Sequence, residues 1–131
     1  MPLRVELVSP ERVAYSGEAK MVICRVATGD IAFQPGHVPF IGKLQTHPVR
    51  LQMDDGSEQK IAVHQGFVEV SGDTITILSD VCELADQVDV GRARASKAAA
   101  EEALRADAND AEAQGALRRA EVRLSVAGAA D

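Results

Sequence analysis

The sequence predicts an α+β protein built in two segments: a β-sandwich or barrel of about ten short strands, followed by an antiparallel hairpin of two helices. All five prolines lie before residue 50. Short runs that alternate apolar and polar residues, separated by turn residues, continue to about residue 86. Beyond residue 92 alanine dominates, and apolar residues recur at helical spacing. We therefore expect a β-sandwich domain over 1–86 and a helical hairpin over 87–131.

Alternation of residue types predicts the first strands. The stretch 3–7 alternates leucine and valine with charged residues, which is typical of a strand with one buried face. A second extended run begins at Val13 and is expected to end at Gly17. The stretch 20–27 is apolar on both faces, so we expect a strand in the interior of a sheet there.

The stretch 28–44 contains two apolar runs separated by several turn-forming residues. Pro35-Gly36 ends the first run, His37 follows, and Pro39 prevents a helix from starting there. Because proline fixes φ and glycine supplies positive φ, we expect two strands joined by a rigid loop that exposes His37.

Further turn signals predict hairpins in the rest of the first segment. Asp55-Gly56 lies between two alternating runs, and Gly72-Asp73 lies between two β-branched runs, both of which are typical of tight turns. Gln65-Gly66 marks another turn between them. Many short strands with closely spaced turns favour a sandwich or barrel.

The C-terminal segment has the periodicity of two amphipathic helices. The first begins at Asp89, and its apolar stripe contains Val90, Ala93, Ala100 and Leu104. We expect Asn109 to cap the second helix in a capping box with Glu112, and Gly128 to end it. Its stripe contains Ala113, Leu117, Ala120, Leu124 and Ala127. Because the stripes are mostly alanine, they remove little apolar area from water, so we expect the hairpin to dock weakly.

Composition argues against several classes of function. The net charge of −6 and the 3% aromatic content disfavour nucleic-acid binding, which needs a basic surface or aromatic side chains for stacking. Cys24 and Cys82 lie in apolar runs without metal-ligand spacing and are expected to be buried thiols. We see no leader segment and no run long enough to span a membrane. Without a Walker loop or a recognisable nucleophile motif, the chain is expected not to be an enzyme on its own.

Three stretches resemble the epsilon subunit of bacterial F-type ATP synthases. The stretch 28–44 is similar to the family segment Gly-Glu-Ile-Gly-Ile-Leu-Pro-Gly-His-x-Pro-Leu, with Asp30 in place of glutamate, Ala32 in place of glycine, and Gln34 in place of an apolar residue. The residues that match are Gly29, Ile31, Pro35, Gly36, His37, Pro39 and Leu44.

The other two stretches extend the resemblance over essentially the whole chain. The stretch 62–80 resembles Ala-Val-x-Gly-Gly-Phe-x-Glu-Val followed by Val-Thr-Ile-Leu-Ala-Asp, with Gln65 where a glycine is common. The stretch 88–93 resembles the Ile-Asp-x-x-Arg-Ala motif that opens the first C-terminal helix of the family. The stretch 117–124 resembles the Ala-x-x-Arg-Ala-x-x-Arg-Leu pattern of the second helix.

The resemblance implies a non-catalytic central-stalk (rotor) subunit that couples ion translocation to ATP synthesis. Its implied partners are the gamma subunit, the membrane rotor ring and, when the helices extend, the catalytic-head subunits. The helices would act as a regulatory brake on ATP hydrolysis. The implied location is the cytoplasmic face of the bacterial plasma membrane, as a peripheral part of the complex, with no nucleic-acid partner and no direct insertion into the membrane.

The resemblance also implies functional residues. Asp30 and His37 would contact the gamma subunit or the rotor ring, and the arginines of the second helix would face an acidic segment of the catalytic subunits. ATP is implied as a regulatory ligand, and no cofactor and no metal site are implied. Ala99 lies where the family members known to bind ATP have a basic residue. The implied ATP contacts are Glu83, Asp89, Arg92, Arg119 and Arg123. The implied partner contacts are Asp30, His37, Arg118, Arg119 and Arg123.

Other interpretations of the same residues stay open at this stage. Asp89 is also interpreted as a helix cap, with Arg92 as a nearby salt-bridge partner. The arginines of 118–123 are also interpreted as part of a helix face exposed to solvent. A free-standing nucleotide-sensing module is one alternative function. A small metal-dependent enzyme that uses His37, His47 and His64 is another.

Overall fold

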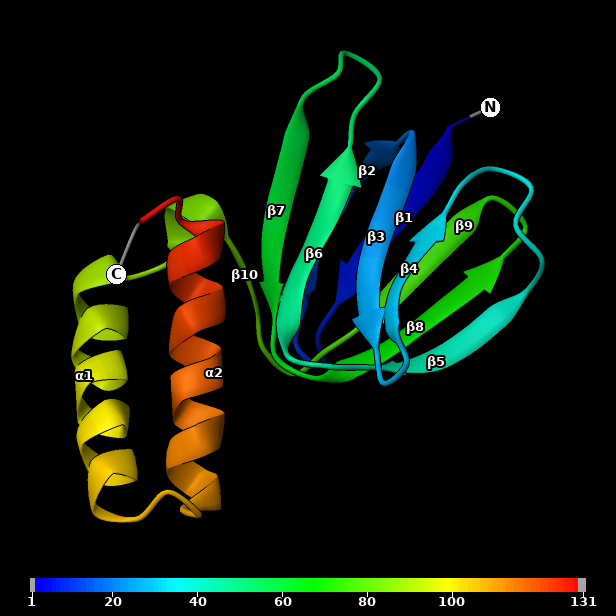
Figure 1. Ribbon diagram of the computed structural model, residues 1–131. Coiled ribbons are helices and arrows are strands. Elements are labelled where there is room, and N and C mark those ends of the chain that lie inside the picture. The colour runs from blue at the N-terminus through cyan, green and yellow to red at the C-terminus, as the bar shows by residue number, and fades with distance from the viewer. Residues whose placement is uncertain (1, 130–131) are drawn as a thin grey trace.

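The computed structural model describes residues 2–129, in which ten strands and a short 3₁₀ turn precede two α-helices (Figure 1). The strands are β1 Leu3–Val8, β2 Val13–Ala19, β3 Met21–Val26, β4 Gly29–Phe33, β5 Phe40–Leu44, β6 His47–Gln52, β7 Glu58–Val63, β8 Gly66–Ser71, β9 Thr74–Leu78 and β10 Cys82–Leu84. The 3₁₀ turn η1 spans Ala85–Gln87, and the helices are α1 Val90–Ala106 and α2 Ala111–Val126. The predicted fold class is confirmed. Residues 1, 130 and 131, at the ends of the two predicted segments, lie outside the described residues.

The strands form two five-stranded sheets that enclose the core. Sheet A has the order β2-β1-β9-β8-β5, and sheet B has the order β10-β7-β6-β3-β4. Neighbouring strands are antiparallel except for β1 and β9, which are parallel. Leu3, Val5 and Leu7 are fully buried, as their alternation predicts. The strand expected inside a sheet is β3, which lies between β6 and β4.

Both cysteines are buried and unpaired, as predicted. Burial, with a smaller contribution from the charge of Asp30, raises the pKa of the Cys24 thiol to about 12. Burial also raises the pKa of the Cys82 thiol. The two thiols therefore stay protonated at neutral pH and act as small apolar side chains of the core.

The stretch 28–44 carries the chain from one sheet to the other. Its two predicted strands are present, but β4 pairs with β3 in sheet B, and β5 pairs with β8 in sheet A. The loop between them thus closes one edge of the sandwich. His37 is half-buried rather than exposed as expected, because its ring packs edge-on against Phe33 with the ring centroids 4.9 Å apart.

Two glycine positions show how backbone geometry shapes the sandwich. Gly17 does not end its strand as expected: it lies within β2, opposite Val5. Gly66 has a positive φ, and a Cβ atom built there would lie 2.1 Å from the carbonyl oxygen of Leu78. Gln65 takes a left-handed φ of 62°, a conformation that glycine adopts most easily. The Ser79 hydroxyl supports this turn by donating to the Gln65 carbonyl, 2.7 Å away.

The helix ends follow capping rules. The Asp89 carboxylate accepts a hydrogen bond from the Arg92 backbone N–H and so caps α1. The predicted cap of α2 is wrong by one residue, because Asp110 rather than Asn109 accepts from the N–H of Ala113. At the C-terminus of α2, the N–H groups of residues 128 and 129 bond to the carbonyls of residues 125 and 124, which is a Schellman motif with Gly128 at positive φ.

Helix α2 lies between α1 and the sandwich, so α2 alone carries the main contact with sheet B (Figure 1). Alanines of both predicted stripes are buried along the helices, at positions 93, 100, 113 and 120. The contact with the sandwich is a separate small cluster of Val122, Val126, Ala62 and the half-buried Val88. The sequence pattern does not single out Val122 and Val126, which lie outside the stripe that faces α1.

Candidate functional site

A hollow of about 420 Å³ lies where the end of the sandwich meets both helices. Its walls include Glu83 from β10, Asp89 and Arg92 from the start of α1, and Arg123 from α2. Four of the five residues that the sequence implied as ATP contacts therefore line one cavity. Ala93, Gln87 and Ser96 complete the wall, and the sequence pattern gives no signal for Gln87 or Ser96.

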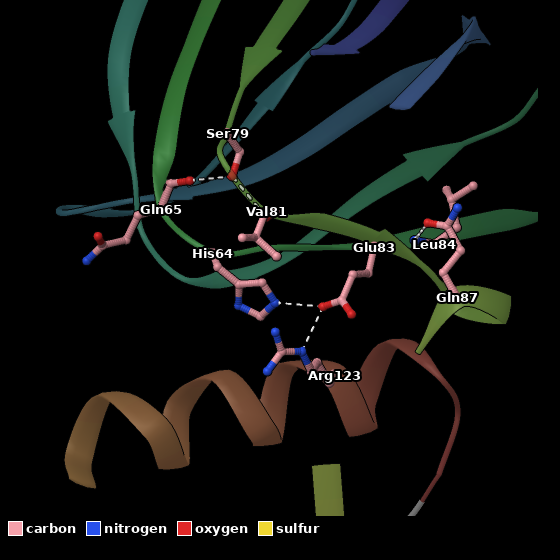
Figure 2. Close-up of polar contacts among 8 residues, drawn as sticks. All are labelled: His64, Gln65, Ser79, Val81, Glu83, Leu84, Gln87 and Arg123. Carbon is pink, nitrogen blue, oxygen red and sulfur yellow. Dashed lines mark hydrogen bonds and ion pairs between the residues drawn. The ribbon is translucent and has the colours of Figure 1, made fainter. Parts of the chain in front are cut away.

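Glu83 joins the sandwich to α2 through its carboxylate (Figure 2). Its Oε1 atom accepts a hydrogen bond from Nε of Arg123 at 2.7 Å and lies 3.1 Å from Nε2 of His64. The side chains of Glu83 and Arg123 are 22% and 29% exposed, so water only partly screens their ion pair. The sequence suggests His64, on the loop after β7, only as a metal ligand in an alternative function, yet it belongs to this polar cluster.

The protonation of His64 is set by its surroundings. Its side chain is 5% exposed, and its Nδ1 atom is buried without a hydrogen-bond partner. Burial lowers the pKa of His64 most strongly, and the charges of Arg123 and Arg119 lower it further, against the opposing effect of Glu83. We therefore assign the neutral tautomer in which Nε2–H donates to Glu83, which leaves Nδ1 as an unprotonated acceptor.

The start of α1 adds positive potential to the hollow. The helix N-terminus carries a partial positive charge, and it faces the cavity together with the Arg92 and Arg123 side chains. Asp89 uses Oδ1 to cap the helix and Glu83 uses Oε1 for Arg123 and His64, so each carboxylate keeps acceptor capacity on its other oxygen. The donor set therefore suits an anionic ligand that also carries hydrogen-bond donors for the two carboxylates.

Arg119 does not line this hollow. It lies at a second one of about 630 Å³, together with Arg118, His64 and Thr46, under the N-terminal half of α2. Arg118 uses its Nε to donate to the Thr46 carbonyl oxygen at 3.0 Å. Within residues 2–129, the Arg119 side chain has no hydrogen bond or ion pair. Arg118 and Arg119 thus border this second hollow and Arg123 the first, and among residues 2–129 only Arg123 of the three is engaged by a carboxylate.

Asp30 and His37 lie at different ends of β4. Asp30 is opposite Arg25 near the β3–β4 turn, and His37 is in the loop beyond the other end of the strand (Figure 1). Nε of Arg25 donates to Oδ1 of Asp30 at 2.6 Å, which lowers the pKa of the Asp30 carboxyl. The structure therefore places these two predicted interface residues in separate regions of the sandwich surface.

Two negative findings concern the described part of the chain. Residues 2–129 contain no group of three or more histidine, cysteine or acidic side chains arranged to hold a metal ion. Of the helices in that range, neither has the length and apolar character needed to cross a membrane.

Comparison with known proteins identifies the family. Residues 2–85 match the family model of the ATP synthase delta/epsilon chain, β-sandwich domain. The chain is 43% identical to the ATP synthase epsilon chain of Streptomyces griseus over 93% of its own length and 92% of the relative's. The chain belongs to the ATP synthase epsilon chain family. It is also 47% identical to the epsilon chain of Brevibacillus brevis, over 78% of its own length and 77% of the relative's.

Solved structures share the fold of this epsilon-family chain. A chain of the Euglena gracilis mitochondrial ATP synthase, in a structure of OSCP, F1 and the c-ring, superposes with a TM-score of 0.69 at 13% identity. That match covers 97% of this chain and 78% of the other. A chain from the central stalk and c-ring of the Tetrahymena thermophila enzyme superposes with a TM-score of 0.53 at 14% identity, covering 68% and 71%.

Proposed function

We propose that this chain is a non-catalytic rotor subunit of an F-type ATP synthase, which couples ion translocation to ATP synthesis. The observation that carries the proposal is family membership over nearly the full length, helices included. The related folds come from structures of the F1–c-ring and central-stalk parts of ATP synthases. In this role the sandwich binds the gamma subunit and the rotor ring, at the cytoplasmic face of a bacterial plasma membrane.

The helical hairpin is the movable part of this proposal. Its attachment to the sandwich consists of the Val122 and Val126 cluster, the Glu83–Arg123 ion pair and the Arg118–Thr46 hydrogen bond. Such a small contact is worth only a few kcal/mol, so the docked and released states lie close in free energy. When α2 is released, Arg118, Arg119 and Arg123 become free to meet acidic surfaces of the catalytic-head subunits, and the extended helices act as a brake on ATP hydrolysis.

ATP bound in the hollow would favour the docked state. Arg92, Arg123 and the α1 N-terminus supply the positive charge that phosphate oxygens need, while Glu83 and Asp89 can accept from ribose or adenine donors. A ligand that binds only the docked form stabilises that form by about 2.7 kcal/mol at a hundredfold excess over its Kd. That amount is comparable with the docking energy, so ATP would shift the population of the two states. Arg119, which lies outside the hollow, contributes only through a movement of its side chain.

Hydrolysis by the reconstituted complex tests the brake. Removing the residues after position 88 should raise ATP hydrolysis while leaving the sandwich in the complex. The variant Arg119→Ala/Arg123→Ala should produce part of the same increase. If truncation leaves hydrolysis unchanged both with and without ATP regeneration, the hairpin is not a brake in this enzyme.

Calorimetry on the isolated chain tests the ligand separately. ATP should bind the full-length chain, and Arg92→Gln should weaken that binding about tenfold or more, because a charge-assisted hydrogen bond to phosphate is lost. Lys20→Gln, on an exposed turn of the sandwich, makes the same charge change away from the hollow and should have no effect. Equal weakening by both variants would show that only the overall charge of the chain matters.

A further inference from the structure

A third hollow, of about 360 Å³, lies between the outer face of sheet B and the other flank of α2. It is separate from the cavity that contains Glu83 and Arg92. Four of the chain's 14 lysines and arginines line it: Arg25 from β3, Arg50 from β6, Lys60 from β7 and Arg118 from α2. This is a marked concentration of positive charge in a chain whose net charge is −6.

The strand register brings two of these cations together. Arg50 on β6 is directly opposite Lys60 on β7, and like charges at such a position destabilise a sheet. Glu58 relieves the repulsion only in part, because its carboxylate pairs with Arg50, at 3.5 Å, and not with Lys60. Among the residues that the structure describes, the Lys60 side chain has no hydrogen bond and no ion-pair partner.

The remaining cations converge on the same place from different elements. Burial is the largest cause of the lowered pKa of His47. The positive charges of Arg25, Arg118 and Arg50 lower it further. Arg25 is held by Asp30, whereas Arg118 donates only to a backbone carbonyl, through Nε. The outer guanidinium nitrogens of Arg118 thus have no acidic partner within residues 2–129.

The acidic residues near the hollow cancel only part of this charge, since three carboxylates face four cations. Asp30 and Glu58 lie beside the arginines that they bind, and Glu121 is the acidic residue of the lining. The side chains of Arg25 and Arg50 are 34% and 39% exposed, so their charges are partly shielded from water. Ser125 adds a hydroxyl donor, and Val122 and Pro48 add apolar wall.

We propose that this hollow binds a phosphate group, free or as part of a small phosphomonoester, between Lys60 of the sheet and Arg118 of the helix. An oxyanion with more than one charge can accept hydrogen bonds from an ammonium group and a guanidinium group at once. A seated phosphate also relieves the Arg50–Lys60 repulsion. Because its ligands come from both the sheet and α2, its binding stabilises the docked state of the hairpin.

The test uses the full-length chain with inorganic phosphate and pyrophosphate as probes, compared with sodium chloride at matched ionic strength. Both probes should shift the backbone amide NMR signals of β6, β7 and the C-terminal half of α2. They should also slow hydrogen exchange in α2 more than chloride does. Lys60→Gln and Arg118→Gln should each weaken phosphate binding about tenfold or more, the loss expected for one charge-assisted hydrogen bond.

Lys43→Gln is the matched control, because it makes the same charge change on β5 of the opposite sheet. Circular dichroism verifies that all three variants are folded. The inference is overturned if phosphate acts no differently from chloride, or if Lys43→Gln weakens binding as much as the other two. It is also overturned if phosphate shifts only the signals around Asp89 and Arg92, since the anion site would then be the other cavity.

Discussion

Shortening the two valines that join α2 to the sandwich should release the hairpin while leaving the β-sandwich folded. The variant Val122→Ala/Val126→Ala removes the equivalent of two methylene groups from each of two side chains that are 4% and 5% exposed. At about 0.8 kcal/mol per buried methylene, the pair lowers the docking free energy by about 3 kcal/mol. Two short helices with an alanine seam are marginally stable once undocked, so their amides should then exchange with solvent.

Native-state hydrogen exchange measures this directly. A loss of 3 kcal/mol raises the exchange rate of α2 amides by about two orders of magnitude, at 1.4 kcal/mol per factor of ten. Amides of β1 and β9 in the core should change far less. Val13→Ala, which removes the same atoms from a side chain that is 55% exposed, is the control and should leave α2 unchanged. Equal acceleration in the sandwich and in α2 would refute the reasoning, because the two parts would then unfold as one cooperative unit.

Three further predictions follow from the same structure. First, burial holds the pKa of His64 below its ordinary value of 6.5, so the unfolded chain binds more protons, and the free energy of unfolding should fall as the pH drops below about 6.5. Urea titrations should show a smaller fall in His64→Gln; an equal fall would assign the effect to other groups, such as His47, whose pKa burial also lowers. Second, Gly66→Ala should lower the unfolding free energy by at least about 2 kcal/mol, because the new Cβ meets the Leu78 carbonyl at positive φ. Gly72→Ala, at a positive φ with no atom within 4 Å of the new Cβ, should lower it by only about 1 kcal/mol, and the reverse order would contradict the steric explanation. Third, Asp30→Asn and His37→Ala should weaken binding to the gamma subunit or rotor ring in pull-down assays and leave the melting temperature nearly unchanged; lost stability with intact binding would make these residues structural.

Local patterns predicted most of the secondary structure. Alternation around Leu3 and Val5 places a strand with one buried face, because successive side chains of a strand point to opposite sides. The Asp55-Gly56 and Gly72-Asp73 turns lie where their positive-φ glycines predict them. The errors are local too. Gly17 continues a strand because pairing with Val5 outweighs its flexibility, and the α2 cap falls on Asp110 because Asn109 is engaged in the preceding turn.

The candidate site was partly predictable. The resemblance singled out Glu83, Asp89, Arg92 and Arg123, and the structure brings them to one hollow. It also singled out Arg119, which lies elsewhere on α2. His64 could have been suspected only from the polarity of a residue directly after a buried strand. Its bond to Glu83 joins residues 19 positions apart, a pairing that follows from β7 and β10 lying side by side.

What the sequence alone determined about this protein is its class, its family resemblance and nearly all its elements, because these depend on side-chain periodicity and turn chemistry within a few residues. The tertiary structure decided how the elements combine. It sends β4 and β5 to different sheets, turns Val122 and Val126 toward the sandwich, and gathers Arg25, Arg50, Lys60 and Arg118 around one hollow. These outcomes depend on strand order, register and the rotation of α2, which are set by packing between residues far apart in the chain.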